Sequence, residues 1–143
     1  MKPDGYAIVR RLQRVYWPRD ILGMYTLERV LRAKPVPEFV REEDPRRCRD
    51  SFNLGRVHHF YRMLRRGQKI TPIEVETYVS SHSFSYCSWG GPFVQDGHHR
   101  FAAAVLAHKR RIPVTFGGLV EQLRWLTGER ALRDLPEGID LQD

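Results

Sequence analysis

VQDGHHRFAAAVLAHKRRIPV, residues 94–114, holds the features from which the fold is predicted. A short apolar strand leads into the DGHHR motif at 96–100, an alanine-rich helix follows, and a second strand is expected at 112–114. A glycine between a strand and a helix start leaves backbone N–H groups and the positive end of the helix dipole directed at one place. Such a place suits an anion, and Arg100 and two histidines add donors to it.

Residue spacing on either side of this stretch predicts the neighbouring elements. Apolar residues between Leu54 and Leu64 recur at helical spacing, which predicts a helix that ends at Gly67. Over residues 73–79, isoleucine, valine and threonine at odd positions alternate with glutamate and tyrosine at even positions, which predicts a half-buried strand. The remaining expectations are strands at 6–9, 15–17 and 93–95, a short helix over 24–31, a loop at 34–50, a hairpin loop at 80–92, a last helix over 119–127 and a weakly ordered tail at 128–143.

This order of elements predicts an α+β fold, with a small mixed sheet, packed helices and a β-α-β arrangement around the glycine. Residues 54–127 are expected to form the core domain. Residues 1–53 are expected to be an N-terminal extension packed on or preceding it, and residues 128–143 a C-terminal tail.

The composition is that of an ordinary globular chain, with 143 residues, 41% hydrophobic and 29% charged. No run approaches the roughly 20 apolar residues of a membrane span, and the first residues lack the apolar core of a signal peptide. Cys48 and Cys87 form neither a disulfide framework nor a CxxC zinc motif. We therefore expect a cytoplasmic protein with reduced thiols and no membrane partner.

Positive charge is concentrated in one window of the chain. The net charge is +7, and residues 46–66 contain seven arginines and a single acid. Arg62 and Arg66 fall opposite the apolar stripe of the predicted helix, and Arg65 lies between them in sequence. A concentrated basic patch favours a polyanion such as DNA through counterion release, so these three arginines are the candidate nucleic-acid contacts. A solvated arginine-rich surface is the alternative.

The DGHHR motif supplies the candidate phosphate-binding residues Gly97, His98 and Arg100. Glycine permits a close backbone approach to a ligand, and arginine donates bidentate hydrogen bonds to phosphate. His98 and His99 point about 100° apart on a helix, so they cannot face one ligand in the same way. One is the candidate general base or phosphate donor, and the other is expected to pack or to cap the helix.

Carboxylates near the motif are candidates for metal binding or acid–base chemistry. Asp96 can hold Mg²⁺ or orient a histidine, and it can equally act as a simple N-cap. Glu74 and Glu76 project from one strand face about 6.5–7 Å apart, where they can hold a metal or act as a base, with Glu74 the catalytic candidate. Solvated charges on a strand face are the alternative for this pair.

Three segments taken together resemble the ParB/sulfiredoxin superfamily and its ParB-like nuclease domain: LRRGQKITPIEV at 64–75, DGHHRFAAA at 96–104 and IPV at 112–114. The resemblance covers about residues 54–118. It implies a domain that binds a nucleotide (ATP, ADP or CTP, with Mg²⁺) or nucleic-acid phosphate and acts as a nucleotide hydrolase or a nuclease on DNA.

Differences within the motif separate the branches of that superfamily. Sulfiredoxins carry a reactive cysteine after the glycine, where this chain has His98, so repair of oxidised peroxiredoxin is not expected. ParB-type proteins bind CTP through a Gly-Glu-Arg-Arg box. Gly97 and Arg100 match that box, while His98 and His99 replace its glutamate and first arginine.

Two further branches define the alternatives. Archaeal free-serine kinases have a similar DGHHR motif and transfer phosphate from ADP, but their catalytic glutamate, in a Lys-Pro-His-Glu context, has no counterpart here. Other members are described as inhibitors of conjugation encoded on plasmids. A small-molecule phosphotransferase and a non-catalytic interaction or inhibitor protein are therefore the alternatives to a nucleotide hydrolase or nuclease.

Overall fold

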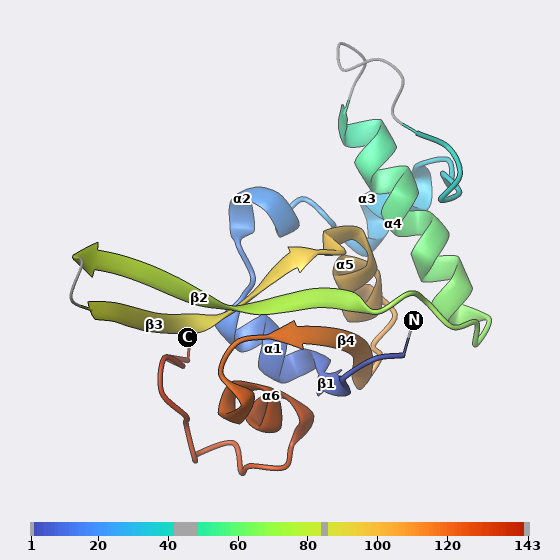
Figure 1. Cartoon of the computed structure of the whole chain (residues 1–143). Helices are drawn as coiled ribbons and strands as arrows, with labels where there is room; N and C mark the ends of the chain where they lie inside the picture. Colours follow the sequence, from blue (N-terminus) through green and yellow to red (C-terminus); the bar gives the residue numbers. More distant parts are fainter. Residues whose placement is uncertain (1, 42–48, 84–85, 142–143) are drawn as a thin grey trace. The chain divides into compact units, whose positions relative to one another are not determined.

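The structure is a computed structural model that describes residues 2–41, 49–83 and 86–141. Four strands of the described residues form one mixed sheet, and helices lie between them and after the last of them along the chain (Figure 1). The predicted α+β class is confirmed. Internal contacts divide the chain into two compact units, which are described one at a time.

The first unit, here called the sheet unit, comprises residues 1–17, 71–97 and 110–143. Its strands lie in the order β1-β4-β2-β3, where β2 is parallel to β4 and the other two pairings are antiparallel. The strands are β1 Gly5–Ile8, β2 Ile73–Ser83, β3 Tyr86–Asp96 and β4 Arg111–Gly117. The hairpin of β2 and β3 extends well beyond the other two strands (Figure 1).

The hairpin confirms one prediction and corrects another. Residues 73–78 alternate as expected, with odd positions buried and even positions exposed. Val79, expected on the buried face, is 48% exposed, because the pairing register shifts between Thr77 and Val79. The segment 80–92 belongs to a hairpin, as predicted, but residues 80–83 and 86–92 are strand and not loop, as in the pairing of Ser80 with Ser88. Its serines and glycines are typical of turns, but backbone pairing with the facing strand satisfies the same N–H and C=O groups.

Two helices of the sheet unit are α1, Val9–Val15, and α6, Val120–Thr127. α6 contacts β1, and α1 contacts both β1 and β3. Leu12 and Trp125 are fully buried in the core that these elements form. The predicted strand at 15–17 is wrong, because Val15 is the last residue of α1. The ring of Tyr16 packs against that of Phe93, with 6.5 Å between the ring centroids.

The described segment after α6 packs against the rest of the sheet unit and is not the weakly ordered tail that the sequence predicts. The indole Nε1 of Trp125 donates to the carbonyl of Leu132 at 3.0 Å. Arg11 donates to the carbonyls of Trp125 and Arg130, both at 2.7 Å. Ile139 is 4% exposed, so the segment also adds to the core.

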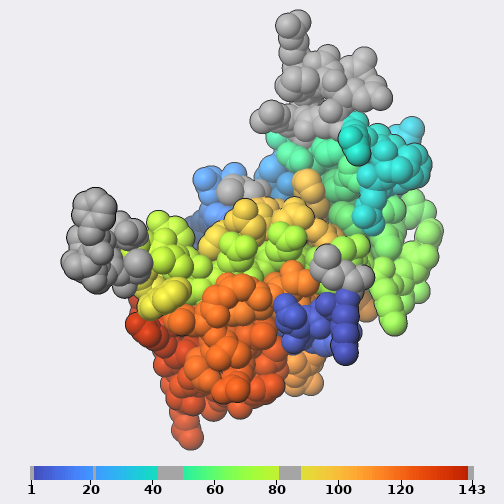
Figure 2. Space-filling view, in the orientation of Figure 1, coloured from blue at the N-terminus to red at the C-terminus, as the bar shows by residue number. Residues whose placement is uncertain are grey.

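The second unit, here called the helical unit, comprises residues 18–70 and 98–109. Its helices are α2 Arg19–Leu22, α3 Leu27–Arg32, α4 Arg49–Arg65 and α5 His98–Leu106. α4 contacts both α3 and α5. Figure 2 shows the chain that follows α3, in cyan and teal, against the green surface of α4.

Local sequence explains how α3 and α4 are bounded. The hydroxyl of Thr26 caps α3 by accepting a hydrogen bond from the backbone N–H of Arg29. α4 ends before Gly67, whose φ of +74° is typical of the residue that follows a helix. The helices expected over 24–31 and from 54 onward are confirmed, the first shorter than expected and the second starting earlier.

Candidate functional site

The predicted strand–glycine–helix junction is present in the structure. β3 ends at Asp96, Gly97 is buried with a φ of +100°, and α5 begins at His98. This φ lies in the region that glycine adopts without steric cost, so the residue type permits the abrupt change from strand to helix. His98 and Arg100 are half-buried in the first turn of α5.

His99 is held by side chains of the helical unit. Its Nε2 lies 3.0 Å from the Oδ1 of Asn53 on α4. Its ring packs edge to face against that of Tyr25, with 6.3 Å between the ring centroids. An amide oxygen only accepts hydrogen bonds, so this hydrogen bond requires the tautomer of His99 that has its proton on Nε2. Of the two adjacent histidines, His99 is therefore the one that packs, which leaves His98 as the candidate for direct contact with phosphate.

Tyr25 and Asn53 are residues that the sequence analysis did not single out. Tyr25 is only 6% exposed. Burial raises the pKa of its phenol to about 12, with a smaller contribution from the negative charge of Asp50, so the phenol stays protonated at neutral pH. Because Asn53 lies 46 positions from His99, no local pattern in the sequence could have indicated their contact.

The candidate carboxylates lie together at the base of the hairpin. Glu74 on β2 is the cross-strand partner of Asp96 on β3, and its neighbour on the other side is Thr115 of β4. Glu76 pairs instead with Phe93. Mg²⁺ commonly uses one or two protein carboxylates plus substrate phosphates, so Glu74 and Asp96 fit a Mg²⁺ site that a phosphate ligand would complete. Within the described residues, no three His, Cys, Asp or Glu side chains are grouped for a metal.

The predicted site residues thus belong to both units. Glu74, Asp96 and Gly97 are part of the sheet unit, and the histidines and Arg100 are part of the helical unit.

Charge is divided very unequally between the two units. The helical unit contains 15 basic and 7 acidic residues, whereas the sheet unit contains 9 basic and 10 acidic residues. The whole positive surplus of the protein therefore belongs to the helical unit. Arg62, Arg65 and Arg66 are all exposed near the end of α4. Two arginines of the basic window, Arg46 and Arg47, and the neighbouring Cys48 lie outside the described residues.

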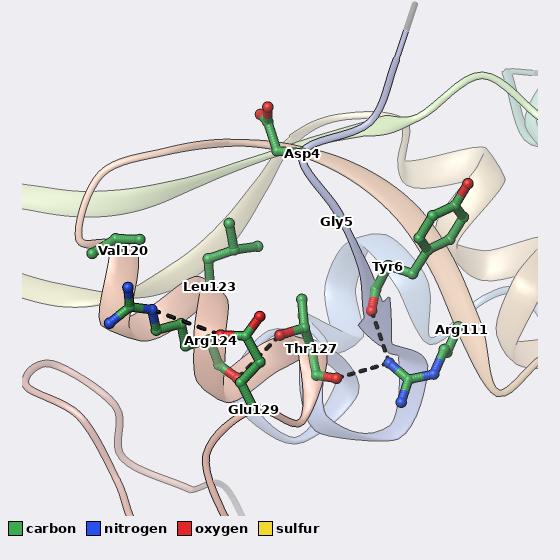
Figure 3. A pocket seen from close by; sticks show the side chains of 9 residues that line it. All are labelled: Asp4, Gly5, Tyr6, Arg111, Val120, Leu123, Arg124, Thr127 and Glu129. Carbon is green, nitrogen blue, oxygen red and sulfur yellow. Dashed lines mark hydrogen bonds and ion pairs between the residues drawn. The ribbon is translucent and has the colours of Figure 1, made fainter.

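A hollow of about 570 Å³ lies in the sheet unit beside β1 and α6 (Figure 3). The guanidinium of Arg111 donates there to the carbonyls of Tyr6 and Thr127, at 3.1 and 2.8 Å. Arg124 pairs with two glutamates, at 2.5 and 3.7 Å. Because both cations are engaged by acceptors of the protein, this hollow is a weaker candidate for an anion than the helical unit.

Comparison with protein-family models, with curated proteins and with solved structures finds no match to this chain. In the part of the chain that the structure describes, no helix combines the length and the apolar character needed to cross a membrane.

Proposed function

We propose that this protein binds nucleic acid through its helical unit. The observation that carries the proposal is the division of charge, 15 basic against 7 acidic residues in the helical unit and 9 against 10 in the sheet unit. Positive charge gathered on one compact unit attracts a polyanion, and binding releases condensed counterions. An even scatter of the same arginines over both units would produce a weaker local field.

Arg62, Arg65 and Arg66 are the central contacts in this proposal. They are exposed and lie within about one turn of α4, so all three can reach one stretch of a phosphate backbone. Phosphate contacts of this kind set affinity and its salt dependence, and they carry no base specificity by themselves.

The test is the binding of fluorescein-labelled DNA at several salt concentrations, measured by fluorescence anisotropy. The triple variant R62A/R65A/R66A is expected to lower the slope of log K against log salt by about 2 to 3, since each lost phosphate contact removes about 0.7 to 0.9. The matched control is R10A/R110A/R133A, which removes three exposed arginines from the sheet unit. Equal losses in the two variants, or no DNA binding by the wild type at low salt, would contradict the proposal.

The junction at 96–100 supports a second contact, to a nucleotide or to a nucleic-acid phosphate. The left-handed glycine, the start of a nine-residue helix and Arg100 are features that favour an anion there. The resemblance to ParB/sulfiredoxin domains suggests ATP, ADP or CTP as the nucleotide. Glu74 and Asp96 of the sheet unit could hold Mg²⁺, which when bound would act as a Lewis acid in hydrolysis of a phosphate ester.

A nucleotide panel with product analysis tests this second contact and separates the alternatives. ATP, ADP and CTP are titrated with Mg²⁺ into the wild type and into Arg100→Ala, which is expected to bind more weakly. Release of inorganic phosphate would support a hydrolase, and transfer of phosphate to free serine would identify a kinase. DNA binding with no turnover would identify an interaction protein. Unchanged nucleotide binding by Arg100→Ala would exclude this residue as the phosphate ligand.

A further inference from the structure

A groove of about 620 Å³ lies in the helical unit between α3 and the first turns of α4. α3 and α4 lie next to each other in this unit (Figure 1). Three of the residues that line the groove are cations, and no described residue that lines it carries a carboxylate. The residues that matter for the argument are Arg29, Arg32 and Lys34 from the α3 side and Ser51, Phe52 and Leu54 from α4.

The chain that follows α3 is attached tightly to α4, so the groove has a firm floor. The backbone N–H of Val36 donates to the carbonyl of Gly55 at 2.9 Å, and the Nδ1 of His58 lies 2.6 Å from the carbonyl of Ala33. A Cβ at position 55 would lie 2.3 Å from the carbonyl oxygen of Lys34, so only glycine allows this close approach. The chain at 33–36 is therefore held firmly against α4.

The cations of the groove are held only weakly by other groups. Arg32 pairs with Glu28 at 2.7 Å, but the two side chains are 77% and 72% exposed, and such surface pairs contribute little. Arg29 makes one long hydrogen bond, of 3.2 Å, to the carbonyl of Met24. A phosphate can replace either contact with a stronger charge-assisted hydrogen bond.

Phe52 adds an aromatic surface to this basic groove. The guanidinium of Arg56 lies over its ring at 4.9 Å and also donates to the carbonyls of Pro37, at 2.8 Å, and Val40. Arg56 therefore holds the ring from one side. Cations beside an aromatic ring are the combination with which proteins bind single-stranded nucleic acid, because the cations meet phosphates and the ring stacks on a base.

The arginines proposed above to bind DNA lie on the same helix as one wall of the groove. Arg62 lies eleven residues after Ser51, and Arg65 lies eleven residues after Leu54. At about 100° and 1.5 Å per residue, each arginine lies about 20° around the helix from its groove partner and about 16 Å further along. Gly55 and His58 lie on the same side of α4, between the groove and the arginines, and there the chain that follows α3 covers the helix. The arginines are therefore a separate set of contacts on the same helix.

We propose that this groove binds a single-stranded segment of nucleic acid. The inference rests on the proposed nucleic-acid binding and deepens it by naming the form of the ligand and a second set of contacts. The phosphates are bound by Arg29, Arg32 and Lys34, and one base stacks on Phe52.

The experiment measures binding of a labelled thymidine oligonucleotide and of an abasic strand of the same length at several salt concentrations. R29A/R32A/K34A is expected to lower the salt slope by about 2 for both probes. Phe52→Leu keeps an apolar side chain and is expected to weaken binding of the thymidine strand by about 5- to 100-fold, with no change for the abasic strand. Circular dichroism and thermal unfolding confirm that each variant is folded.

Glu28→Gln is a variant expected to strengthen binding, whereas the variants above are expected to weaken it. It removes the carboxylate that competes for Arg32, so binding of both probes is expected to tighten, whereas a groove that does not bind phosphate predicts no change. The groove inference fails if wild type binds, R62A/R65A/R66A weakens binding and the groove variants do not. It also fails if duplex DNA or poly-glutamate competes as well as the single strand. If the wild type binds no nucleic acid at all, the proposed function fails with it.

Discussion

Replacing the buried Gln122 by methionine is expected to destabilise the sheet unit strongly. Gln122 is 0% exposed, and its amide accepts a hydrogen bond from the hydroxyl of Thr77 at 2.8 Å. It also donates to the carbonyls of Gly90 at 2.8 Å and Glu137 at 2.9 Å. One side chain thus joins β2, β3 and the C-terminal segment to α6.

The magnitude follows from those three hydrogen bonds. Methionine fills a similar volume but leaves one hydroxyl and two carbonyls without the amide, and each buried polar group that loses its partner costs about 1–3 kcal/mol. We expect the free energy of unfolding to fall by about 3–9 kcal/mol, the sum over the three groups. Since domains are stable by only about 5–15 kcal/mol, this is a large share of the total.

Tryptophan fluorescence during urea unfolding is the appropriate assay, because Trp17, Trp89 and Trp125 all belong to the sheet unit. Gln95→Met is the matched control, since Gln95 is exposed on β3 and the same chemical change there is expected to alter stability by no more than about 0.5 kcal/mol. A loss of less than 1 kcal/mol in Gln122→Met would refute the reasoning.

The same site predicts a pH dependence for Gln122→Glu. Burial and two facing carbonyls disfavour a carboxylate, so the folded protein would hold the pKa of this glutamate above its unfolded value. A raised folded pKa means that the variant is least destabilised below the unfolded pKa of about 4.3 and loses stability as pH rises through the folded pKa. Equal destabilisation of this variant at pH 4 and pH 8 would contradict the assignment.

Three further predictions concern individual residues. Because the pKa of Tyr25 is raised to about 12, its contribution to stability should persist below pH 10 and be lost as the pH approaches 12; Tyr25→Phe should lack this loss in alkaline denaturation curves. Gly118→Ala should cost at least about 2–3 kcal/mol in urea unfolding, because its φ is +136° and a Cβ would lie 2.2 Å from the Oγ1 of Thr77, whereas Gly67→Ala, with open space around it, should cost about 1 kcal/mol. Asn53→Leu should reduce the population of the Nε2-protonated tautomer of His99, which can be measured by the ¹⁵N chemical shifts of the imidazole ring.

Local features of the sequence were enough to predict the elements around the candidate site. Gly97 between an apolar strand and an alanine-rich helix indicated the junction, because its conformational freedom and the change of period are both local properties. The alternation over 73–78 likewise indicated which faces of β2 are buried. The hairpin arms at 80–92 could not be predicted in this way, because composition shows serines and glycines but not the facing strand that pairs with them.

The sequence alone determined where the helix of the motif starts, how much positive charge the chain carries and which residue types could bind phosphate. These properties depend on neighbours in the chain and on side-chain chemistry. Only the tertiary structure decided that His99 packs against Asn53, that the segment after α6 joins the core, and that residues 98–109 assemble with 18–70 into one basic unit. These features depend on contacts between residues far apart in the chain. Such contacts leave no local periodic pattern in the sequence, because burial and pairing are properties of the folded packing.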